Sequence, residues 1–209
     1  MIPSNPSITA WLIDLDGTLY SPKPVQLAMA AELLLSGPHR ISLLQAFRRH
    51  HESLRHELGL SSDLEFLPSP FDEQLRRTAD KEGVDVKVLR QLVNGWMMAR
   101  PGKWLRLSRR RRLLSAIGEF RMRGGKTAIV SDYPAEQKLA ALGCRQLFDL
   151  VVSNGEHPRL TRLKPAPDGM QIAADELGVL ASECLVIGDR EDADGAAARA
   201  AGMSFHLIR

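Results

Sequence analysis

A chain of 209 residues is long enough to bury one sizeable hydrophobic core, with room for a small second lobe. Hydrophobic residues make up 44% and charged residues 25% of the chain, which are the proportions of an ordinary globular protein. The formal net charge of +3 is too small to indicate a nucleic-acid partner by itself.

Targeting and membrane-spanning segments are not expected from the sequence. No apolar run is long enough to cross a bilayer, and the short run near the N-terminus lacks the preceding basic region of a signal peptide. Cys144 and Cys184 show no metal-ligand spacing and stand among apolar residues, so we expect buried free thiols. Free thiols are typical of a reducing compartment, which favours a cytoplasmic location.

The first predicted element is a strand over residues 8–13, an apolar run typical of the centre of a parallel sheet. Two carboxylates follow it, Asp14 and Asp16, with one residue between them. Because side chains at positions i and i+2 of an extended chain point the same way, both can serve one site at the strand's carboxyl end. Ligands bind at that end in open α/β sheets. Gly17 allows a sharp turn there, and Thr18 adds a hydroxyl group.

Residues 21–100 show helical periodicity and no strand pattern. The clearest helix covers residues 40–58, where apolar residues recur at spacings of three and four. Residues 61–70 are predicted to form a loop, and two further helices begin after the N-cap residues Ser69 and Asp85. We therefore predict an all-helical cap domain, residues 21–100, inserted after the first strand.

Strands and helices alternate after residue 101. The predicted strands cover residues 127–131, 150–152, 185–187 and 204–208. Strands that are separated by helices imply a parallel sheet with right-handed crossovers. We therefore predict an α/β fold, with a Rossmann-like core domain made of residues 1–20 and 101–209 and the helical cap inserted in it.

Further polar residues stand at or near strand ends in this second part. Ser131 closes one strand, Asp189 closes another, and Asp194 follows five residues later. Lys164 precedes a proline-rich helix start. Each residue is a weak signal alone, since a lone Ser is usually structural and a lone Lys usually solvated. Because the carboxyl ends of parallel strands meet at one edge of a sheet, we expect these side chains to converge with Asp14.

The charges in this set suit phosphoryl transfer. A phosphate monoester is dianionic, so a site must neutralise it before a carboxylate can approach. Lys164 and a divalent metal would supply the positive charge. The carboxylates of Asp14, Asp189 and Asp194 offer hard oxygen ligands, which suit Mg²⁺.

The carboxylates of Asp14 and Asp16 suit two different catalytic roles. Asp14 can attack phosphorus to give an aspartyl-phosphate, and Asp16 can protonate the leaving oxygen and then activate water. Ser131 and Thr18 offer hydrogen-bond donors to the phosphoryl oxygens. We therefore predict a Mg²⁺-dependent phosphatase.

At this point the sequence resembles the haloacid dehalogenase superfamily of phosphohydrolases, and the resemblance covers nearly the whole chain. Four motifs agree in order and spacing, and the long gap after the first one is similar to that of members with a helical cap inserted there. The matching segments are Asp14-Leu15-Asp16-Gly17-Thr18, Ile129-Val130-Ser131-Asp132, Leu163-Lys164-Pro165-Ala166-Pro167 and Ile187-Gly188-Asp189-Arg190, with Asp194-Gly195 after the last.

The resemblance implies a role for each matching residue of the first motif. Asp14 is expected to be the nucleophile and a metal ligand. Asp16 is expected to be the general acid and base, with its backbone carbonyl on the metal. Thr18 is expected to help hold Asp16 and the phosphoryl group.

The resemblance also implies roles for the later motifs. Ser131 and the amide of Asp132 are expected to bind phosphate, and Lys164 to neutralise charge between nucleophile and phosphate. Asp189 is expected to bind Mg²⁺. For the second acid of the last motif, Asp194 fits best and Asp192 less well.

Several alternatives stay open. Dehalogenases need no general acid two residues after the nucleophile, so Asp16 argues against dehalogenation. A phosphomutase would use the same core residues, and an interaction protein could hold an anionic partner on the same fold. The expected partner is a small phosphorylated metabolite, such as a sugar phosphate or a nucleotide, and both a monomer and a homodimer fit the sequence.

Outside the motifs, the stretch from Arg100 to Lys126 holds ten basic residues and one acid, Glu119. It lacks the interleaved aromatic residues of a single-strand-binding surface, which favours the solvated face of a core helix over a nucleic-acid or other anionic partner. In the cap, packing is favoured over substrate contact for both His51 and Trp96.

Overall fold

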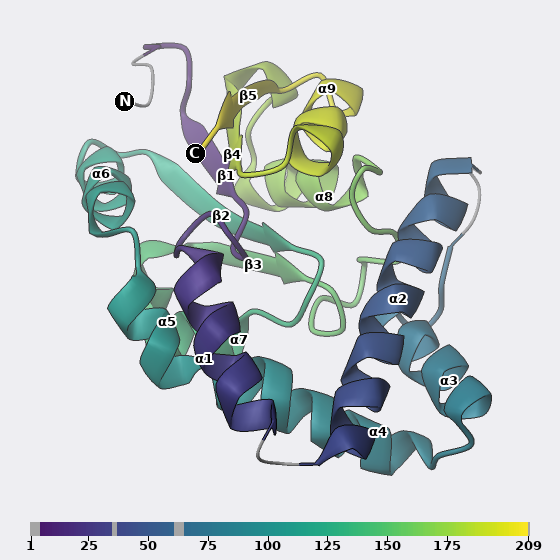
Figure 1. Cartoon of the computed structure of the whole chain (residues 1–209). Helices are drawn as coiled ribbons and strands as arrows, with labels where there is room; N and C mark the ends of the chain where they lie inside the picture. Colours follow the sequence, from purple (N-terminus) through teal and green to yellow (C-terminus); the bar gives the residue numbers. More distant parts are fainter. Residues whose placement is uncertain (1–4, 35–36, 61–64, 209) are drawn as a thin grey trace.

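The protein is described by a computed structural model that covers residues 5–34, 37–60 and 65–208. In this described part, five parallel strands form one sheet in the order β3-β2-β1-β4-β5 (Figure 1). The strands are β1 (Ala10–Ile13), β2 (Lys126–Ser131), β3 (Leu150–Ser153), β4 (Cys184–Gly188) and β5 (Ser204–Leu207). The predicted α/β fold with a parallel sheet is confirmed.

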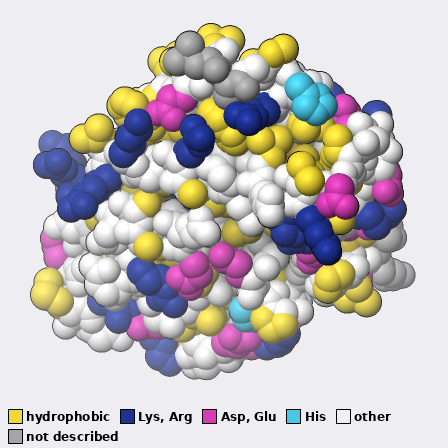
Figure 2. Space-filling model, turned by 90° about the horizontal axis from the view of Figure 1, so that it is seen from below, with side chains coloured by type: hydrophobic (Ala, Val, Ile, Leu, Met, Phe, Trp, Pro, Cys, Tyr) yellow, Lys and Arg dark blue, Asp and Glu magenta, His cyan; other side chains and the backbone are white. Residues whose placement is uncertain are grey.

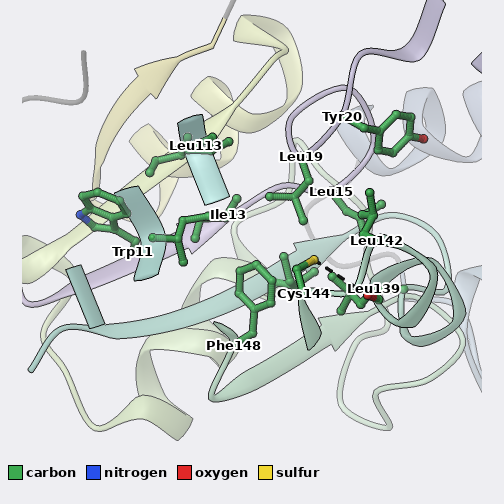
Figure 3. Close-up of a cluster of buried hydrophobic side chains, with 14 of the residues drawn as sticks. Trp11, Ile13, Leu15, Leu19, Tyr20, Leu113, Leu139, Leu142, Cys144 and Phe148 are labelled. Carbon is green, nitrogen blue, oxygen red and sulfur yellow. Dashed lines mark hydrogen bonds between the residues drawn. The ribbon is translucent and has the colours of Figure 1, made fainter. Parts of the chain in front are cut away.

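The central strand β1 is buried along its whole length because helices cover both faces of the sheet. Trp11 and Ile13 face one hydrophobic cluster, part of which Figure 3 shows. Ala10 and Leu12 face a second cluster on the other side. The first face is covered by α5 (Gly102–Ser108), α6 (Arg111–Met122) and α7 (Glu136–Leu142), and the second by α8 (Asp168–Leu177) and α9 (Ala196–Ala200).

The strand register brings the motif residues to one edge of the sheet. Ile13 of β1 is level with Ile129 of β2 and with Ile187 of β4. Asp14 follows Ile13 directly, whereas Ser131 and Asp189 each stand two residues beyond Ile129 and Ile187, so all three lie at the same edge of the sheet. This is the physical reason why residues far apart in the sequence meet at one site.

The helical segment between β1 and α5 packs to one side of the sheet (Figure 1). Its α2, α3 and α4 share a hydrophobic cluster that includes Phe47, Leu75 and Leu89. The described residues between 21 and 100 contain helices and turns and no strand. The helices are α1 (Pro22–Leu34), α2 (Pro38–Leu60), α3 (Pro70–Glu82) and α4 (Val86–Val93), the last continued by a π-helical turn (Asn94–Ala99).

The predicted caps are present. The Ser69 hydroxyl accepts a hydrogen bond from the amide of Asp72, and the Asp85 carboxylate accepts from the amides of Lys87 and Val88. Of the predicted loop 61–70, residues 61–64 lie outside the described part, and α3 begins at Pro70.

One helix was not expected. Residues Gly102–Ser108 form α5, although their sequence showed no recognisable periodicity. A helix this short is held by packing rather than by its own propensity, and Leu105 is fully buried in the core cluster. Among the described residues, no helix has both the length and the apolar character needed to cross a membrane.

Two residues of the basic stretch between Arg100 and Lys126 bind neighbouring parts of the same chain. Arg121 pairs with Asp149, and Arg109 donates to the carbonyl of Leu142. On the face seen in Figure 2, Lys and Arg side chains lie in several small groups among acidic and apolar ones. That face therefore carries no single continuous basic patch.

Candidate active site

The predicted residues surround a small cavity at the carboxyl ends of the strands. Its volume is about 120 Å³. Asp14 follows β1, Ser131 ends β2, and Asp189 follows β4. Lys164 comes from the loop between β3 and α8, and Asp194 from the turn before α9. Those five residues line the cavity together with Asp16 and Asp132.

Lys164 joins two of the carboxylates. Its Nζ lies 2.6 Å from Oδ1 of Asp14 and 2.7 Å from Oδ1 of Asp194, and it also donates to the carbonyl of Val130 at 3.2 Å. The lysine is only 5% exposed. A buried ammonium is stable only when it is paired and fully hydrogen-bonded, and these three acceptors meet that need.

The cavity holds more negative than positive charge. Oxygen atoms of Asp14, Asp189 and Asp194 all lie within 4.8 Å of one another. Burial raises the pKa of Asp14 to about 8, against the opposing charge of Lys164, and the second oxygen of Asp14 has no hydrogen-bond partner among the described residues. Burial and the charge of Asp194 also raise the pKa of Asp189. Three oxygen ligands with unbalanced charge fit a hard divalent cation such as Mg²⁺.

Two glycines allow these carboxylates to approach the backbone. Gly17 has a φ of +94°, and a Cβ atom there would lie 2.1 Å from Oδ2 of Asp189. A Cβ atom on Gly188 would lie 2.3 Å from Oδ2 of Asp194. Any larger residue at either position would displace an acid of the cluster.

Asp16 is held by two residues that the motifs do not contain. Lys138 of α7 donates to both of its oxygens, at 2.8 and 2.6 Å, and the hydroxyl of Tyr20 donates to Oδ1. Burial alone raises the pKa of Asp16, but the charge and hydrogen bonds of Lys138 and the Tyr20 bond outweigh it, so the pKa is lowered. The sequence does hold one signal for Lys138, which is its spacing of three and four residues from Ala135 and Leu142, both of which are buried.

The helical segment also contributes to the site. Arg55 of α2 is only 6% exposed, and its Nε donates to the carbonyl of Lys164 at 2.9 Å. The amide of Lys164 donates to Oδ1 of Asp132, whose Oδ2 lies 3.9 Å from the Arg55 guanidinium. Arg55 was not among the residues predicted for the site, and its partner Lys164 lies 109 residues away in the sequence.

The predicted phosphate-binding residues differ in their surroundings. The Ser131 hydroxyl lies in the cavity and accepts a hydrogen bond from the amide of Tyr133. Thr18 is fully buried, its hydroxyl has no partner among the described residues, and it does not line the cavity. Asp192 is exposed and paired with Arg190, outside the cluster that contains Asp194.

A second cavity of about 380 Å³ adjoins the first, and both are lined by Asp16, Glu52, Tyr133 and Asp189. The helical segment contributes Met29, Arg48, Trp96 and Met97 to it, and the core contributes Lys138. His51 lines the first cavity, but it is buried and stacks on the ring of Tyr133 with centroids 4.3 Å apart. The structure therefore gives His51 and Trp96 a packing role and also places both at a cavity wall.

The parallel sheet, the inserted helices and the acids at the strand ends define an α/β protein with a Rossmann-like core and a candidate site at the carboxyl ends of its strands. A sequence model of the haloacid dehalogenase-like hydrolases matches residues 8–202. The chain belongs to this family, and the predicted membership is confirmed.

Individual relatives agree with the family. The chain is 46% identical over 77 residues to the fructose-1-phosphate phosphatase YqaB of Escherichia coli, a match that spans 36% of this chain and 38% of that protein. The L-2-haloacid dehalogenase of Xanthobacter autotrophicus has 23% identity and a TM-score of 0.64, covering 96% of this chain and 77% of that one. A HAD phosphatase from Thermococcus onnurineus has 20% identity and a TM-score of 0.59, covering 97% and 86%. The two structural matches show the shared fold.

Proposed function

We propose that this protein is a Mg²⁺-dependent phosphatase that hydrolyses a small phosphomonoester through an aspartyl-phosphate on Asp14. One observation carries the proposal: Asp14 and Asp16 line the same cavity, and each is paired with a different buried lysine. Two carboxylates in separate environments suit a nucleophile and a proton donor. The matched fructose-1-phosphate phosphatase supports a phosphoester substrate.

The chain's own residues account for the first step. Lys164 keeps the oxygen of Asp14 that it binds in place, and the other oxygen accepts no hydrogen bond from the described residues, which leaves it available to attack phosphorus. Mg²⁺, when bound, supplies positive charge that stabilises the phosphoryl oxygens. The residues that would hold it are Asp14, Asp16 through its backbone carbonyl, Asp189 and Asp194.

Proton transfer falls to Asp16. Its carboxyl group protonates the leaving oxygen in the first step and takes a proton from water in the second. Ser131 and the amide of Asp132 bind the phosphoryl oxygens, and Thr18, the buried last residue of the first motif, closes its turn by donating from its amide to the carbonyl of Leu15. The Arg55 contact keeps the helical segment closed over the cavity, which limits the access of water during the first step.

The architecture supports two domains with the boundaries predicted from the sequence. Residues 21–100 form the cap, and residues 1–20 and 101–209 form the core. The amide of Ser21 donates to the carbonyl of Ser108, so the chain enters the helical segment beside the end of α5, the first helix that follows that segment. Cys144 and Cys184 are buried free thiols, in keeping with a cytoplasmic enzyme, and we propose a monomer or a homodimer.

The test is phosphate release from p-nitrophenyl phosphate and a panel of sugar phosphates and nucleotides, in Mg²⁺ and in EDTA. Asp14→Asn should abolish turnover. Asp192→Asn is the matched control, because Asp192 is exposed and lies outside the acid cluster. The proposal fails if folded wild-type protein releases no phosphate from any ester.

Parallel assays distinguish the phosphatase from a dehalogenase and from a phosphomutase. Chloride release from 2-chloropropionate reports a dehalogenase, which the structural neighbours include. Transfer of the phosphoryl group to a substrate hydroxyl, seen as a phosphorylated product without free phosphate, reports a mutase.

A further inference from the structure

Lys138 is a buried cation outside the family motifs. It lies on α7, only 5% exposed, with its helix anchored in the core cluster by Leu139 and Leu142. Its Nζ is 2.8 and 2.6 Å from the two oxygens of Asp16. Within the described residues, Asp16 is the only carboxylate in ion-pair distance of Lys138.

Packing alone does not explain an ammonium at this position. A buried ion pair loses the hydration of both charges, and an apolar side chain of similar volume is often as stable in its place. Methionine would fill the space of Lys138 and match its apolar neighbours. We therefore look for the role of Lys138 in its effect on its ion-pair partner, Asp16.

The three hydrogen bonds to Asp16 fix the orientation of its carboxyl group. Lys138 holds both oxygens from α7, and Tyr20 holds Oδ1 from the loop after the first motif. A single bond would leave the group free to rotate about its last torsion, whereas bonds to both oxygens fix the plane. Positional precision of this kind is what proton transfer to a bound substrate requires.

The cavities show on which side the lysine acts. Asp14 and Lys164 line only the smaller cavity, and Lys138 lines only the larger one. Asp16 lines both. The carboxyl group of Asp16 therefore stands between the phosphoryl side and the space left for the organic part of the ester, and Lys138 approaches it from the second side.

We propose that Lys138 is a positioning residue that holds the carboxyl group of Asp16 at the leaving oxygen of the substrate. The inference rests on the proposed phosphatase function. Lys138 and Tyr20 hold Asp16 as a carboxylate in the free enzyme, so before the first step Asp16 takes a proton from solvent on Oδ2, which among the described residues accepts only from Lys138. In the first step, a bond forms between Asp14 and phosphorus, the bond from phosphorus to the leaving oxygen breaks, and the Asp16 proton moves to that oxygen. In the second, water attacks phosphorus, Asp14 leaves, and Asp16 takes the proton of water. Lys138 keeps its own protons throughout.

The proposal makes the effect of Lys138 depend on the leaving group. An alkyl phosphate must be protonated as its bond breaks, because an alkoxide is a poor leaving group. The nitrophenolate of p-nitrophenyl phosphate leaves without that help. Since kcat/KM reports steps up to the first irreversible one, it isolates protonation of the leaving group from hydrolysis of the intermediate.

The experiment measures kcat/KM with Mg²⁺ for p-nitrophenyl phosphate and for the best alkyl phosphate of the panel across a range of pH. The maxima of the pH profiles are compared, because removing Lys138 also removes a charge that lowers the pKa of Asp16. Lys138→Met should lower the alkyl value by about 10- to 100-fold, a large part of what general acid catalysis supplies, and the nitrophenyl value by less than about threefold. Lys138→Arg, which keeps two donors, should recover much of the loss. Lys138→Gln serves as the neutral variant if Lys138→Met does not fold, as judged by thermal unfolding.

A double-mutant cycle tests whether the effect passes through Asp16. In an Asp16→Asn background, Lys138→Met should cause no further loss for the alkyl ester. Equal losses for both esters, or a loss that persists without Asp16, would overturn the positioning role and leave a structural ion pair. Wild-type protein that is inactive on every ester would instead overturn the proposed function.

Discussion

Without a divalent cation, we predict that the carboxyl group of Asp14 makes the folded protein less stable as the pH rises. Burial raises its pKa from 3.8 to about 8, although the charge of Lys164 opposes the rise. Between these two values the folded state binds a proton that the unfolded state has released, so stability falls with pH. Below about pH 4, Asp14 is protonated in both states and its stabilising effect on the folded state is at its maximum. Between about pH 4 and about pH 8, the free energy of unfolding falls by about 1.4 kcal/mol for each pH unit.

Asp14→Asn isolates this contribution, because an amide of the same shape does not ionise. In EDTA, the unfolding free energy of the wild type relative to this variant should fall by about 2 kcal/mol between about pH 6 and about pH 7.5. For a chain of this size, that difference corresponds to about 4–8 °C in Tm. Urea unfolding at the two pH values, with Asp192→Asn as the control, measures it.

Magnesium should reverse the effect. At 100 times its Kd, Mg²⁺ adds about 2.7 kcal/mol to the stability of the wild type, and Asp14→Asn should lose most of this gain. At a fixed Mg²⁺ concentration the gain should be larger at the higher pH, because the cation has to displace the Asp14 proton. A wild-type minus variant difference that stays constant or increases with pH in EDTA would refute the reasoning, since Asp14 would then be ionised without metal.

Three further changes have definite expected outcomes. Gly188→Ala should lower stability by about 1–3 kcal/mol and weaken Mg²⁺ binding, because the new Cβ meets Asp194; urea unfolding and magnesium titration measure the two effects. Arg55→Ala should cost about 1–3 kcal/mol in urea unfolding, since it leaves the carbonyl of Lys164 without its donor. Ser69→Ala should cost about 1 kcal/mol through the lost N-cap, measured by thermal unfolding.

Gly188→Ala and Arg55→Ala each have a control in the same chain. Gly118→Ala places a Cβ no closer than 3.9 Å to a neighbour and should be tolerated. Arg49→Ala removes an exposed arginine from the helix that carries Arg55 and should change stability by less than about 0.5 kcal/mol. If either control is as damaging as its partner, the contact named for that partner is not the cause.

Local signals in the sequence predicted much of this molecule. A cap such as Ser69 or Asp85 bonds to amides two or three residues away, so its partners lie within the segment that reveals it. Asp14 and Asp189 could be placed because each ends a strand, and parallel strands bring their ends to one edge. Both kinds of prediction need only nearby residues and the direction of the chain.

Contacts between distant residues could not be predicted in this way. Lys138 and Asp16 are 122 residues apart, and Arg55 and Lys164 are 109 residues apart. Helical periodicity predicts on which face of its helix a residue lies. It does not predict which residues pack against that face, because this depends on how the helical segment packs on the sheet. The helix α5 was missed for a similar reason, because its stability comes from Leu105 in the core.

The bond from Arg55 to the carbonyl of Lys164 bears on how the cap of such an enzyme can be exchanged. The same lysine holds Asp14 through its ammonium group, so one residue joins the cap to the proposed nucleophile. A chimaera that receives a cap without an arginine at this position would inherit a buried carbonyl with no donor, next to the most highly charged part of the core. Transplanting a cap to change substrate preference in this protein therefore requires the arginine to be carried over with it.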